Sequence, residues 1–220
     1  KGGVALSEHQ SKHLLAEWGV PVTTETLVQT ADAAVEAGSE IGYPVVLKAD
    51  VTGMPHKTEA GLVKLGLDDE AAVRAAYDEV TSNAANAGAG MNGVLVQEMV
   101  ADAVEVIVGV SYDSQLGATI LFGSGGVMVE VYNDVSLRLC PIDESDALEM
   151  ITEVKGARLL EGFRGQPAAD IAALADTLVR VSQLGAQLEG SLAELDINPL
   201  MVLPTGQGVR AADAVAIFQP

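Results

Sequence analysis

Lys48 is the first residue of this chain whose type and position suggest chemistry. It follows the apolar run Tyr43-Pro44-Val45-Val46-Leu47, which is typical of a strand buried on both faces and therefore central in its sheet. A single lysine at the end of such a strand can hold a nucleotide phosphate as a point charge. The alternative is a strand-end lysine that extends into water, as most do.

Asp196 and Asn198 lie far later, in the segment that ends with Pro199 and Leu200. They are two residues apart in a predicted strand, so they share a face. With Asp213 they form a set of oxygen ligands, which magnesium prefers. The alternative is two turn-forming residues and a helix cap. If the fold brings Lys48 to these oxygens, the chain binds an ATP-like ligand.

A third group of candidates follows a predicted strand at the point where the chain enters a new segment. The backbone there can recognise the edge of an adenine, and Glu98 can accept a hydrogen bond from a ribose or an exocyclic amine. An ordinary solvated strand end is the alternative. The residues concerned are Gln97, Glu98, Met99 and Val100.

Glu105 is an acidic residue among β-branched neighbours, and a carboxylate in such a segment needs a reason. Either it faces solvent on an alternating strand, or it faces a nucleotide or a metal ion. Both interpretations stay open.

A glycine-rich turn at 123–126, which includes Gly125 and Gly126, can wrap a phosphate with backbone N–H groups. It contains neither the P-loop nor the Rossmann glycine pattern. Arg138 follows Glu130 and Asp134 at spacings of four residues. It can neutralise phosphate or belong to a local ion network.

His56 lies in the predicted loop 50–60, eight residues after Lys48. An imidazole near a phosphate site can act as a nucleophile toward phosphorus, although most loop histidines have no such role. His9 and His13, on the first predicted helix, are expected to be structural. Three histidines and one cysteine without ligand spacing do not suggest a transition-metal site.

Alternating helical and strand patterns must position these residues, which favours an α/β class. A capping box of Ser7 and Gln10 predicts the first helix, and Thr30, Asp68 and Asp143 are expected to begin others. The predicted helices cover 7–18, 30–42, 68–82, 143–153 and 168–188, and the predicted strands cover 21–28, 45–48, 61–67, 94–100, 105–112, 115–122, 127–131, 135–139, 192–198 and 200–203. Residues 83–93 are expected to be a flexible connection.

The 220 residues, 49% of them hydrophobic, suffice for one large domain or two joined lobes. A net charge of −19 argues against nucleic acid or an anionic membrane as partner. Any phosphate site must therefore gather cations or backbone N–H groups locally.

One cysteine excludes an internal disulfide and fits a cytoplasmic setting. No apolar run approaches the roughly 18 residues of a membrane helix, and no signal peptide is evident. Lys1-Gly2-Gly3 resembles a trimmed end, so we expect a piece of a longer protein.

Taken in order, these segments resemble the ATP-grasp part of ADP-forming acyl-CoA synthetases. This is the β-subunit type of acetate–CoA ligase, related to the succinyl-CoA synthetase β chain. The motifs lie at 6–8, 42–48, 56–61, 123–127, 194–200 and 212–214. Each is modest alone, but their order and spacing are specific.

The resemblance implies an α/β (α+β) ATP-grasp fold, in which two α/β lobes hold ATP or ADP between them. Residues 1–20 would form a helix leading into the fold, 21–100 lobe 1 and 101–220 lobe 2. By the same resemblance Lys48 holds phosphates, residues 97–100 form the adenine hinge and Glu105 lines the nucleotide pocket. Asp196, Asn198 and Asp213 would hold Mg²⁺.

The resemblance also implies an activity: acid, CoA and ATP give acyl-CoA, ADP and phosphate. His56 matches the loop histidine that relays the phosphoryl group, although Glu59 and Leu62 depart from the expected aspartate and glycine. No CoA-binding segment is present, so a CoA-binding α-type domain or subunit is expected as partner, and an oligomer as the full enzyme. Alone, the chain should bind nucleotide but turn over little or nothing.

Two other functions remain open. The first is an ATP-grasp ligase that forms an acyl phosphate directly, which would make His56 dispensable. The second is a non-catalytic module that senses nucleotide, for which Lys48 would not affect turnover of the parent enzyme.

Overall fold

The computed structural model describes residues 3–53, 57–125, 134–162 and 167–220. These form two compact units. The small unit contains residues 6–10 and 23–99, and the large unit contains residues 1–5, 11–22 and 100–220. The chain passes from the small to the large unit between Met99 and Val100. Helix α1 (Glu8–Glu17) contributes its first residues to the small unit and the rest to the large one.

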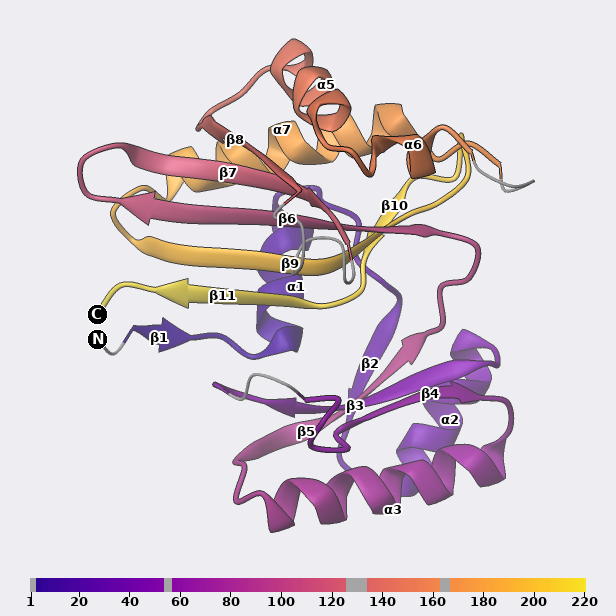
Figure 1. The fold of residues 1–220 in the computed structure, drawn as a ribbon. Coiled ribbons are helices and arrows are strands. Elements are labelled where there is room, and N and C mark those ends of the chain that lie inside the picture. Colours follow the sequence, from indigo (N-terminus) through magenta and orange to yellow (C-terminus); the bar gives the residue numbers. More distant parts are fainter. Residues whose placement is uncertain (1–2, 54–56, 126–133, 163–166) are drawn as a thin grey trace. The chain divides into compact units, whose positions relative to one another are not determined.

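The small unit is a four-stranded sheet with two helices. The strands follow the order β2 (Glu25–Val28), β5 (Met91–Glu98), β3 (Val45–Val51) and β4 (Val63–Leu67), and all neighbours are antiparallel. Helices α2 (Ala31–Ile41) and α3 (Glu70–Asn86) pack together against this sheet (Figure 1).

Strand β3 determines where the chemistry of the small unit lies. Every residue of β3 is buried, and the strand occupies an inner position, as predicted. Leu47 and Ala49 belong to the core formed with the helices. Because side chains alternate along a strand, Lys48 and Asp50 point to the opposite face.

Local capping signals account for the helix starts. Ser7 and Gln10 form the predicted capping box, with Ser7 N–H to Gln10 Oε1 at 3.0 Å and Gln10 N–H to Ser7 Oγ at 3.4 Å. Thr30 Oγ1 accepts from Ala33 N–H at 3.2 Å, as predicted. The cap of α3 is Asp69, however, and not Asp68.

Two predicted boundaries in the small unit are wrong. Strand β3 does not end at Lys48 but continues to Val51. Helix α3 continues to Asn86 and β5 begins at Met91, so the connection predicted at 83–93 shrinks to 87–90. The pairing of β3 with β5, which includes Val51 opposite Met91, extends these two strands past residues that have weak strand propensity.

The large unit contains a seven-stranded antiparallel sheet. Its order is β1 (Val4–Ala5), β11 (Ala214–Phe218), β9 (Leu192–Val202), β6 (Val104–Asp113), β7 (Gly117–Ser124) and β8 (Val135–Leu139), with β10 (Val209–Ala211) paired to β9. The predicted β6–β7 hairpin is confirmed, with Asp113 opposite Gly117.

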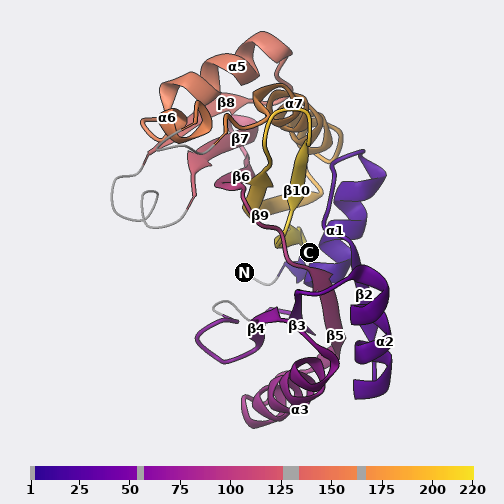
Figure 2. The ribbon, with the colours of Figure 1, turned by 90° about the vertical axis from the view of Figure 1, so that its right-hand side faces the viewer.

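Helices of the large unit cover one face of this sheet. The amphipathic helix α7 (Ile171–Gln187) packs against β6, β7 and β9, and α5 (Glu144–Glu153) packs against α7 and β8. Figure 2 shows these helices beside the sheet, with the short α6 (Ala157–Leu160) next to α5. Val106, Val108 and Val110 alternate toward the buried face, so Glu105 is on the other face.

Three further outcomes concern the predicted strands. The segments 192–198 and 200–203 form the single strand β9, which runs through Pro199. Strand β11 was not predicted, and the strand expected at 127–131 lies outside the described residues.

None of the described helices combines the length and apolar character that crossing a bilayer requires.

Candidate functional site

Lys48 is buried in the small unit with only 6% of its surface exposed. Its Nζ lies 2.8 Å from Glu8 Oε1, and Glu8 is 2% exposed. The ammonium therefore does not extend into water, which was the alternative considered from the sequence. It is a buried cation held by a carboxylate from the first turn of α1.

Glu8 has a second cationic partner. Its Oε2 accepts a hydrogen bond from Lys57 Nζ, and the Lys57 side chain is 17% exposed. We call Glu8, Lys48 and Lys57 the Glu8 cluster. The cluster gathers two ammonium groups around one carboxylate in a chain of net charge −19, and the buried Asp50 carboxylate lies on the same face of β3 as Lys48. Cations gathered locally are what an anion-binding site in this chain requires.

Backbone bonds hold the segment that follows Lys57. Leu62 N–H donates to Lys57 O at 2.9 Å, and Ala49 N–H of β3 donates to Leu62 O at 2.9 Å. Leu62 is fully buried, and Asn83 Nδ2 of α3 donates to Gly61 O at 3.0 Å. His56, the predicted catalytic residue, lies outside the described residues.

The residues predicted to contact adenine end the small unit. Gln97 is 3% exposed and pairs with Val46, so it shares a face with Lys48. Glu98 accepts from Thr24 N–H at 2.7 Å through Oε1, a bond to a residue distant in sequence that was not foreseen. Met99 is 40% exposed, and Val100 begins the C-terminal segment of the large unit.

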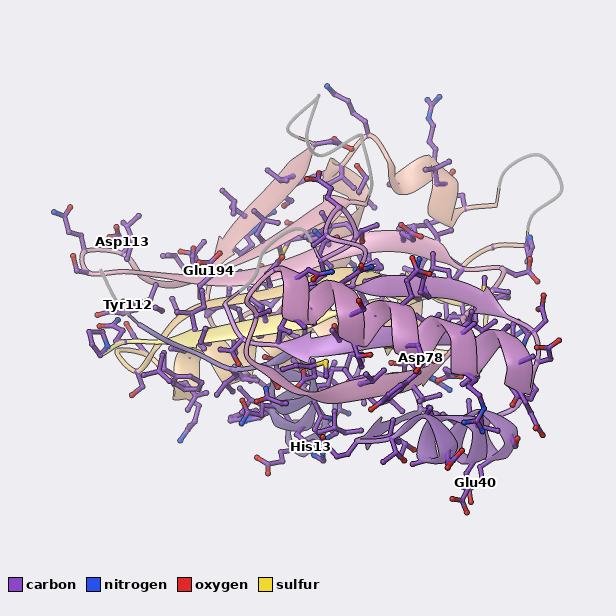
Figure 3. All side chains as sticks on the ribbon, turned by 90° about the horizontal axis from the view of Figure 1, so that it is seen from below. His13, Glu40, Asp78, Tyr112, Asp113 and Glu194 are labelled. Atoms are coloured by element: carbon purple, nitrogen blue, oxygen red, sulfur yellow. The ribbon has the colours of Figure 1, made fainter. Side chains whose placement is uncertain are left out.

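Asp196 lies on β9 in the large unit, opposite Gly109 on β6 and Val215 on β11. Burial, together with the charges of Glu194 and Asp213, raises its pKa to about 6. Glu194 is opposite Ser111, close to the hairpin end marked by Tyr112 and Asp113 in Figure 3. A carboxylate with acidic neighbours is stabilised by a bound cation.

Asn198 and Asp213, the other predicted metal ligands, are brought together. Asn198 N–H donates to Asp213 O at 3.1 Å. Among the described residues, no three histidine, cysteine, aspartate or glutamate side chains form a ready metal site. With Asp196 the set offers two carboxylates and one amide. These oxygens suit magnesium, which usually takes further ligands from water and from phosphate.

Glu105 is exposed on β6, on the face opposite α7, and pairs with Met201 of β9. Its carbonyl accepts from Gly125 N–H at 3.0 Å. A Cβ at Gly125 would lie 2.5 Å from this carbonyl oxygen, so the position requires glycine. Gly126, its predicted companion, lies outside the described residues.

Asp134 connects the two described ends of the glycine-rich region. Its Oδ2 accepts from Ser124 Oγ at 2.8 Å and from Gly156 N–H at 2.8 Å, and its Oδ1 accepts from Lys155 N–H at 2.8 Å. We call Ser124, Asp134, Lys155 and Gly156 the Asp134 cluster. Burial raises the pKa of Asp134, whereas these hydrogen bonds together lower it by more, so the net shift is downward.

Arg138 is paired with a carboxylate in the large unit. Its two terminal nitrogens contact Glu153 at 3.1 and 2.6 Å, and this bond, offset by burial, gives the Arg138 pKa a net upward shift. To neutralise a phosphate, Arg138 would have to exchange this partner. Its role as a phosphate ligand stays a prediction.

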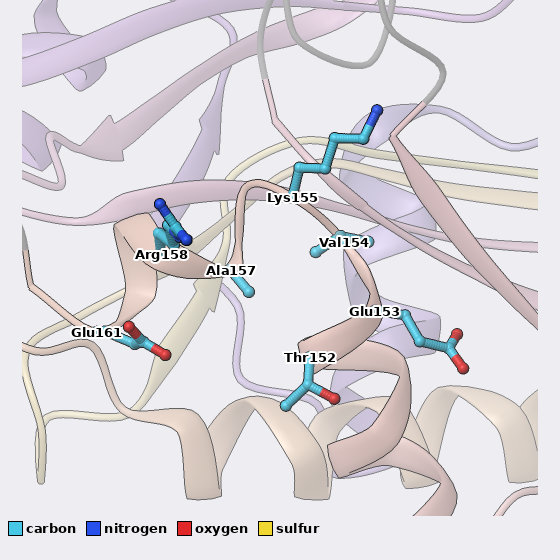
Figure 4. A pocket seen from close by; sticks show the side chains of 7 residues that line it. All are labelled: Thr152, Glu153, Val154, Lys155, Ala157, Arg158 and Glu161. Atoms are coloured by element: carbon cyan, nitrogen blue, oxygen red, sulfur yellow. The ribbon is translucent and has the colours of Figure 1, made fainter.

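A hollow of about 490 Å³ lies beside α5 and α6 (Figure 4). Lys155 and Arg158 line it together with Glu153 and Glu161. Its mixed charges define no ligand, and it contains none of the predicted site residues.

The described residues thus form one group of candidates in each unit. Lys48 and Gln97 share a face of the small sheet, whereas Asp196, Asn198 and Asp213 lie together on the large one. Sequence reasoning included Glu8 in a helix start and in the motif at 6–8 but gave it no role in the site. An acidic residue in a first helical turn is common and gives no signal of two lysine partners.

Known proteins are similar to this chain in sequence. A family model described as an ATP-grasp domain matches residues 1–217. The β subunit of ADP-forming acetate–CoA ligase II from Pyrococcus furiosus is 38% identical over 221 residues, covering 100% of this chain and 94% of that subunit. ADP-forming 4-hydroxybutyrate–CoA ligase from Nitrosopumilus maritimus is 37% identical over 210 residues, covering 94% of this chain but 30% of that protein.

Solved structures of one protein are also similar. Dinucleotide-forming acetyl-coenzyme A synthetase 1 of Ca. Korarchaeum cryptofilum, in complex with coenzyme A and Ca-AMPCP, has a TM-score of 0.93 at 41% identity, covering 98% of this chain and 93% of that chain. A second structure, with coenzyme A and Mg-AMPPCP, has a phosphohistidine segment pointing towards the nucleotide binding site. It gives a TM-score of 0.84 at 40% identity, covering the same shares of the two chains.

Proposed function

Because the chain belongs to the ATP-grasp domain family, together with the β subunits of ADP-forming acetate–CoA ligases, we propose that it is the nucleotide-binding component of an ADP-forming acyl-CoA synthetase. The proposed overall reaction converts acid, CoA and ATP into acyl-CoA, ADP and phosphate. CoA and the acyl group would be handled by another subunit or by another part of a longer polypeptide.

One observation carries this proposal: the likeness to the Pyrococcus furiosus β subunit extends over the whole of this chain and 94% of that subunit. A shared domain within an otherwise different enzyme would leave much of that subunit unmatched. The Glu8 cluster supports the proposal independently, because it supplies local positive charge for a phosphate in a strongly acidic chain.

The residues divide into three proposed roles. Lys48 binds phosphate oxygens, with Gln97 to Val100 beside the base and Glu105, Gly125, Gly126 and Arg138 around the nucleotide. Asp196, Asn198 and Asp213 hold Mg²⁺, a fit supported by their oxygen donors and by the raised pKa of Asp196. Bound magnesium would supply neutralisation of phosphate charge.

His56 is proposed to relay the phosphoryl group. Its imidazole nitrogen would form a bond to the γ-phosphorus of ATP while the bond to the β-phosphate oxygen breaks, and ADP would leave. A histidine of the CoA-binding portion would then accept the group. The reverse sequence would return it to ADP.

Calorimetry on the chain with ATP and MgCl₂ tests nucleotide binding. Lys48→Met is expected to weaken binding at least tenfold, because the phosphate loses a buried cation. Lys64→Met is the matched control: Lys64 lies on the neighbouring strand β4 and pairs with Glu79 at 2.5 Å. Equal affinity in all three proteins would overturn the proposed role of Lys48.

A second experiment separates the relay from a ligase that needs no histidine. The chain is incubated with radiolabelled ATP and MgCl₂, and acid-labile, base-stable phosphate on the protein is measured. His56→Asn should abolish the label while leaving ATP affinity within about threefold. Label that persists in His56→Asn would exclude His56 as the acceptor.

A further inference from the structure

The turn between β10 and β11 carries Asp213, one of the three proposed metal ligands. On one side of this turn the backbone bonds to β9. Ala212 N–H donates to Pro199 O at 3.0 Å, and Asp213 O accepts from Asn198 N–H at 3.1 Å. The position of Asp213 therefore depends on how the two flanking strands are held.

Strand β11 has β9 on one edge and the short β1 on the other. The two residues of β1 pair with Ile217 and Phe218. Ala216 comes just before this pairing, and its N–H donates to Ser11 Oγ of helix α1 at 3.0 Å. Ser11 and Ala216 are both 0% exposed. The hydroxyl therefore supplies the acceptor that a longer β1 would have supplied, at a place where an unpaired N–H would be costly.

The segment that contains Ser11 also holds the other end of the turn. Ala211 N–H donates to Pro21 O at 2.9 Å, and Val22 forms a parallel bridge with Ala211. Residues 11–22 belong to the large unit, as do β10 and β11. They bracket the turn, with one bond before Asp213 and one after it. The first bond uses a backbone carbonyl, whereas the second uses the Ser11 side chain and can be removed by substitution.

We propose that Ser11 is a positioning residue for the magnesium site, in which its hydroxyl holds β11 and thereby the proposed ligands Asp213 and Asp196. Strand β11 begins directly after Asp213 and places Val215 opposite Asp196. This inference rests on the proposed role of these acids in holding Mg²⁺. Ser11 contacts neither the ion nor the nucleotide in this role, and it acts through the strand.

The geometry that magnesium demands explains why one hydroxyl matters. Mg²⁺ requires a nearly ideal octahedral arrangement of its oxygen ligands. Without the hydroxyl, β11 must shift until the Ala216 N–H finds another acceptor or water. Such a shift moves Asp213 at the start of the strand. Loss of a group that orients metal ligands typically weakens metal binding about 10- to 100-fold.

Binding of Mn²⁺ measures the site without turnover, because Mn²⁺ takes the same oxygen ligands as Mg²⁺. The probe is MnCl₂ titrated into the chain without nucleotide, with free Mn²⁺ followed by electron paramagnetic resonance. Ser11→Ala should weaken Mn²⁺ binding about tenfold or more. If Ser11→Ala does not fold, Ser11→Cys keeps a weak acceptor of similar size and should show a smaller loss.

Ser182→Ala is the matched control. Ser182 is also a helical serine of the large unit, 0% exposed, and its Oγ accepts from Ile142 N–H at 3.1 Å. It holds the segment before α5, which contains none of the proposed metal ligands. Its loss should lower the urea midpoint as Ser11→Ala does, but Mn²⁺ affinity should stay within about twofold of the wild type.

Amide hydrogen exchange, measured by NMR without metal, tests the contact itself. In Ser11→Ala the Ala216 amide should exchange about tenfold faster or more. The Ala211 amide, which is held by Pro21 O, is the internal reference and should change less. An Ala216 amide that exchanges at the wild-type rate would show that Ser11 does not hold β11.

The outcomes separate this inference from the proposed function. Unchanged Mn²⁺ affinity in Ser11→Ala overturns the positioning role. An equal loss of affinity in Ser182→Ala also overturns it, because the effect would then follow stability in general. Failure of the wild-type chain to bind Mn²⁺ counts against the proposed metal ligands, and exchange at Ala216 then still decides whether Ser11 holds the strand.

Discussion

Individual buried charges in this protein have clear local compensation. Lys48 has Glu8 at 2.8 Å. Asp170, 8% exposed, accepts from the N–H groups of Gly206 and Gly208, each at 2.9 Å. No buried side-chain nitrogen or oxygen lacks a hydrogen-bond partner in the described part of the chain. Asp196 differs, because the charges that shift its pKa are those of other acids.

The raised pKa of Asp196 predicts a dependence of stability on pH. Its folded pKa of about 6 exceeds the ordinary value of 3.8, so the folded state binds the proton more tightly than the unfolded state. Stability present below pH 4 is therefore lost as the pH rises through 6, by about 1 to 3 kcal/mol. Urea denaturation between pH 4 and 8 without divalent ions measures this loss.

Asp196→Asn should remove this contribution to the pH dependence, and MgCl₂ should restore stability at pH 7 to the wild-type protein only. Glu144→Gln, an exposed acid on α5, is a suitable control. An unchanged pH profile in Asp196→Asn would contradict the assignment.

At the scale of elements, the Asp134 cluster joins the end of β7 and the residue before β8 to the turn between α5 and α6. Three donors converge on one carboxylate. Each hydrogen bond to a charged group contributes about 1.5 to 3 kcal/mol to the free energy of unfolding. Two substitutions test this junction.

Asp134→Asn should lower the free energy of unfolding by about 2 to 3 kcal/mol at pH 7, because the amide accepts fewer of these bonds. The lowered folded pKa gives the sign of the pH effect: the stabilisation exists above the unfolded pKa and is lost as the pH falls through the folded value. Asp176→Asn, which removes an exposed pair with Arg180, should cost less than about 1 kcal/mol. Equal losses in chemical denaturation would show that the junction contributes little.

Gly156→Ala tests the packing of the same turn. The added Cβ would lie 2.4 Å from Ser124 Cβ, so the turn must move, at an expected cost of about 1 to 3 kcal/mol. At Gly90 no atom lies within 4 Å of an added Cβ, and Gly90→Ala should be nearly neutral. Thermal unfolding of both variants measures the difference, and a neutral Gly156→Ala would indicate that the turn adapts freely.

Elements with local signals were predictable, and those that depend on distant partners were not. Thr30 and the Ser7–Gln10 box mark helix starts that the structure confirms. The continuation of β3 to Val51 was missed because Asp50 is held by His9 N–H and Asn92 Nδ2, from remote segments. In the candidate site, the sequence predicted which residue types could bind a ligand and which of them share a face of a strand. It could not predict the pairing of Lys48 with Glu8, because these residues are distant in sequence.

At the scale of the molecule, the resemblance predicted the ATP-grasp fold, and the match over residues 1–217 confirms it. The net charge of −19 predicts a global electrostatic effect. Like charges repel in the folded state, and salt screens them over about 10 Å at 0.1 M. Raising NaCl from 20 to 500 mM should therefore raise the midpoint of thermal unfolding, by about 2 to 4 °C for each kcal/mol relieved.

Sucrose at equal osmolality separates screening from general solute effects, because it leaves charge repulsion in place. A midpoint that falls with NaCl would mean that surface ion pairs such as Arg74–Asp32 outweigh the repulsion.

Strand β1 lies antiparallel to β11, with Val4 opposite Phe218 and Ala5 opposite Ile217, so the first and last strands of the large unit are neighbours in its sheet (Figure 1). Domains with adjacent ends can be spliced into a host sequence with little distortion. The pairing of β1 with β11 therefore offers two neighbouring strand ends at which a host sequence can be attached.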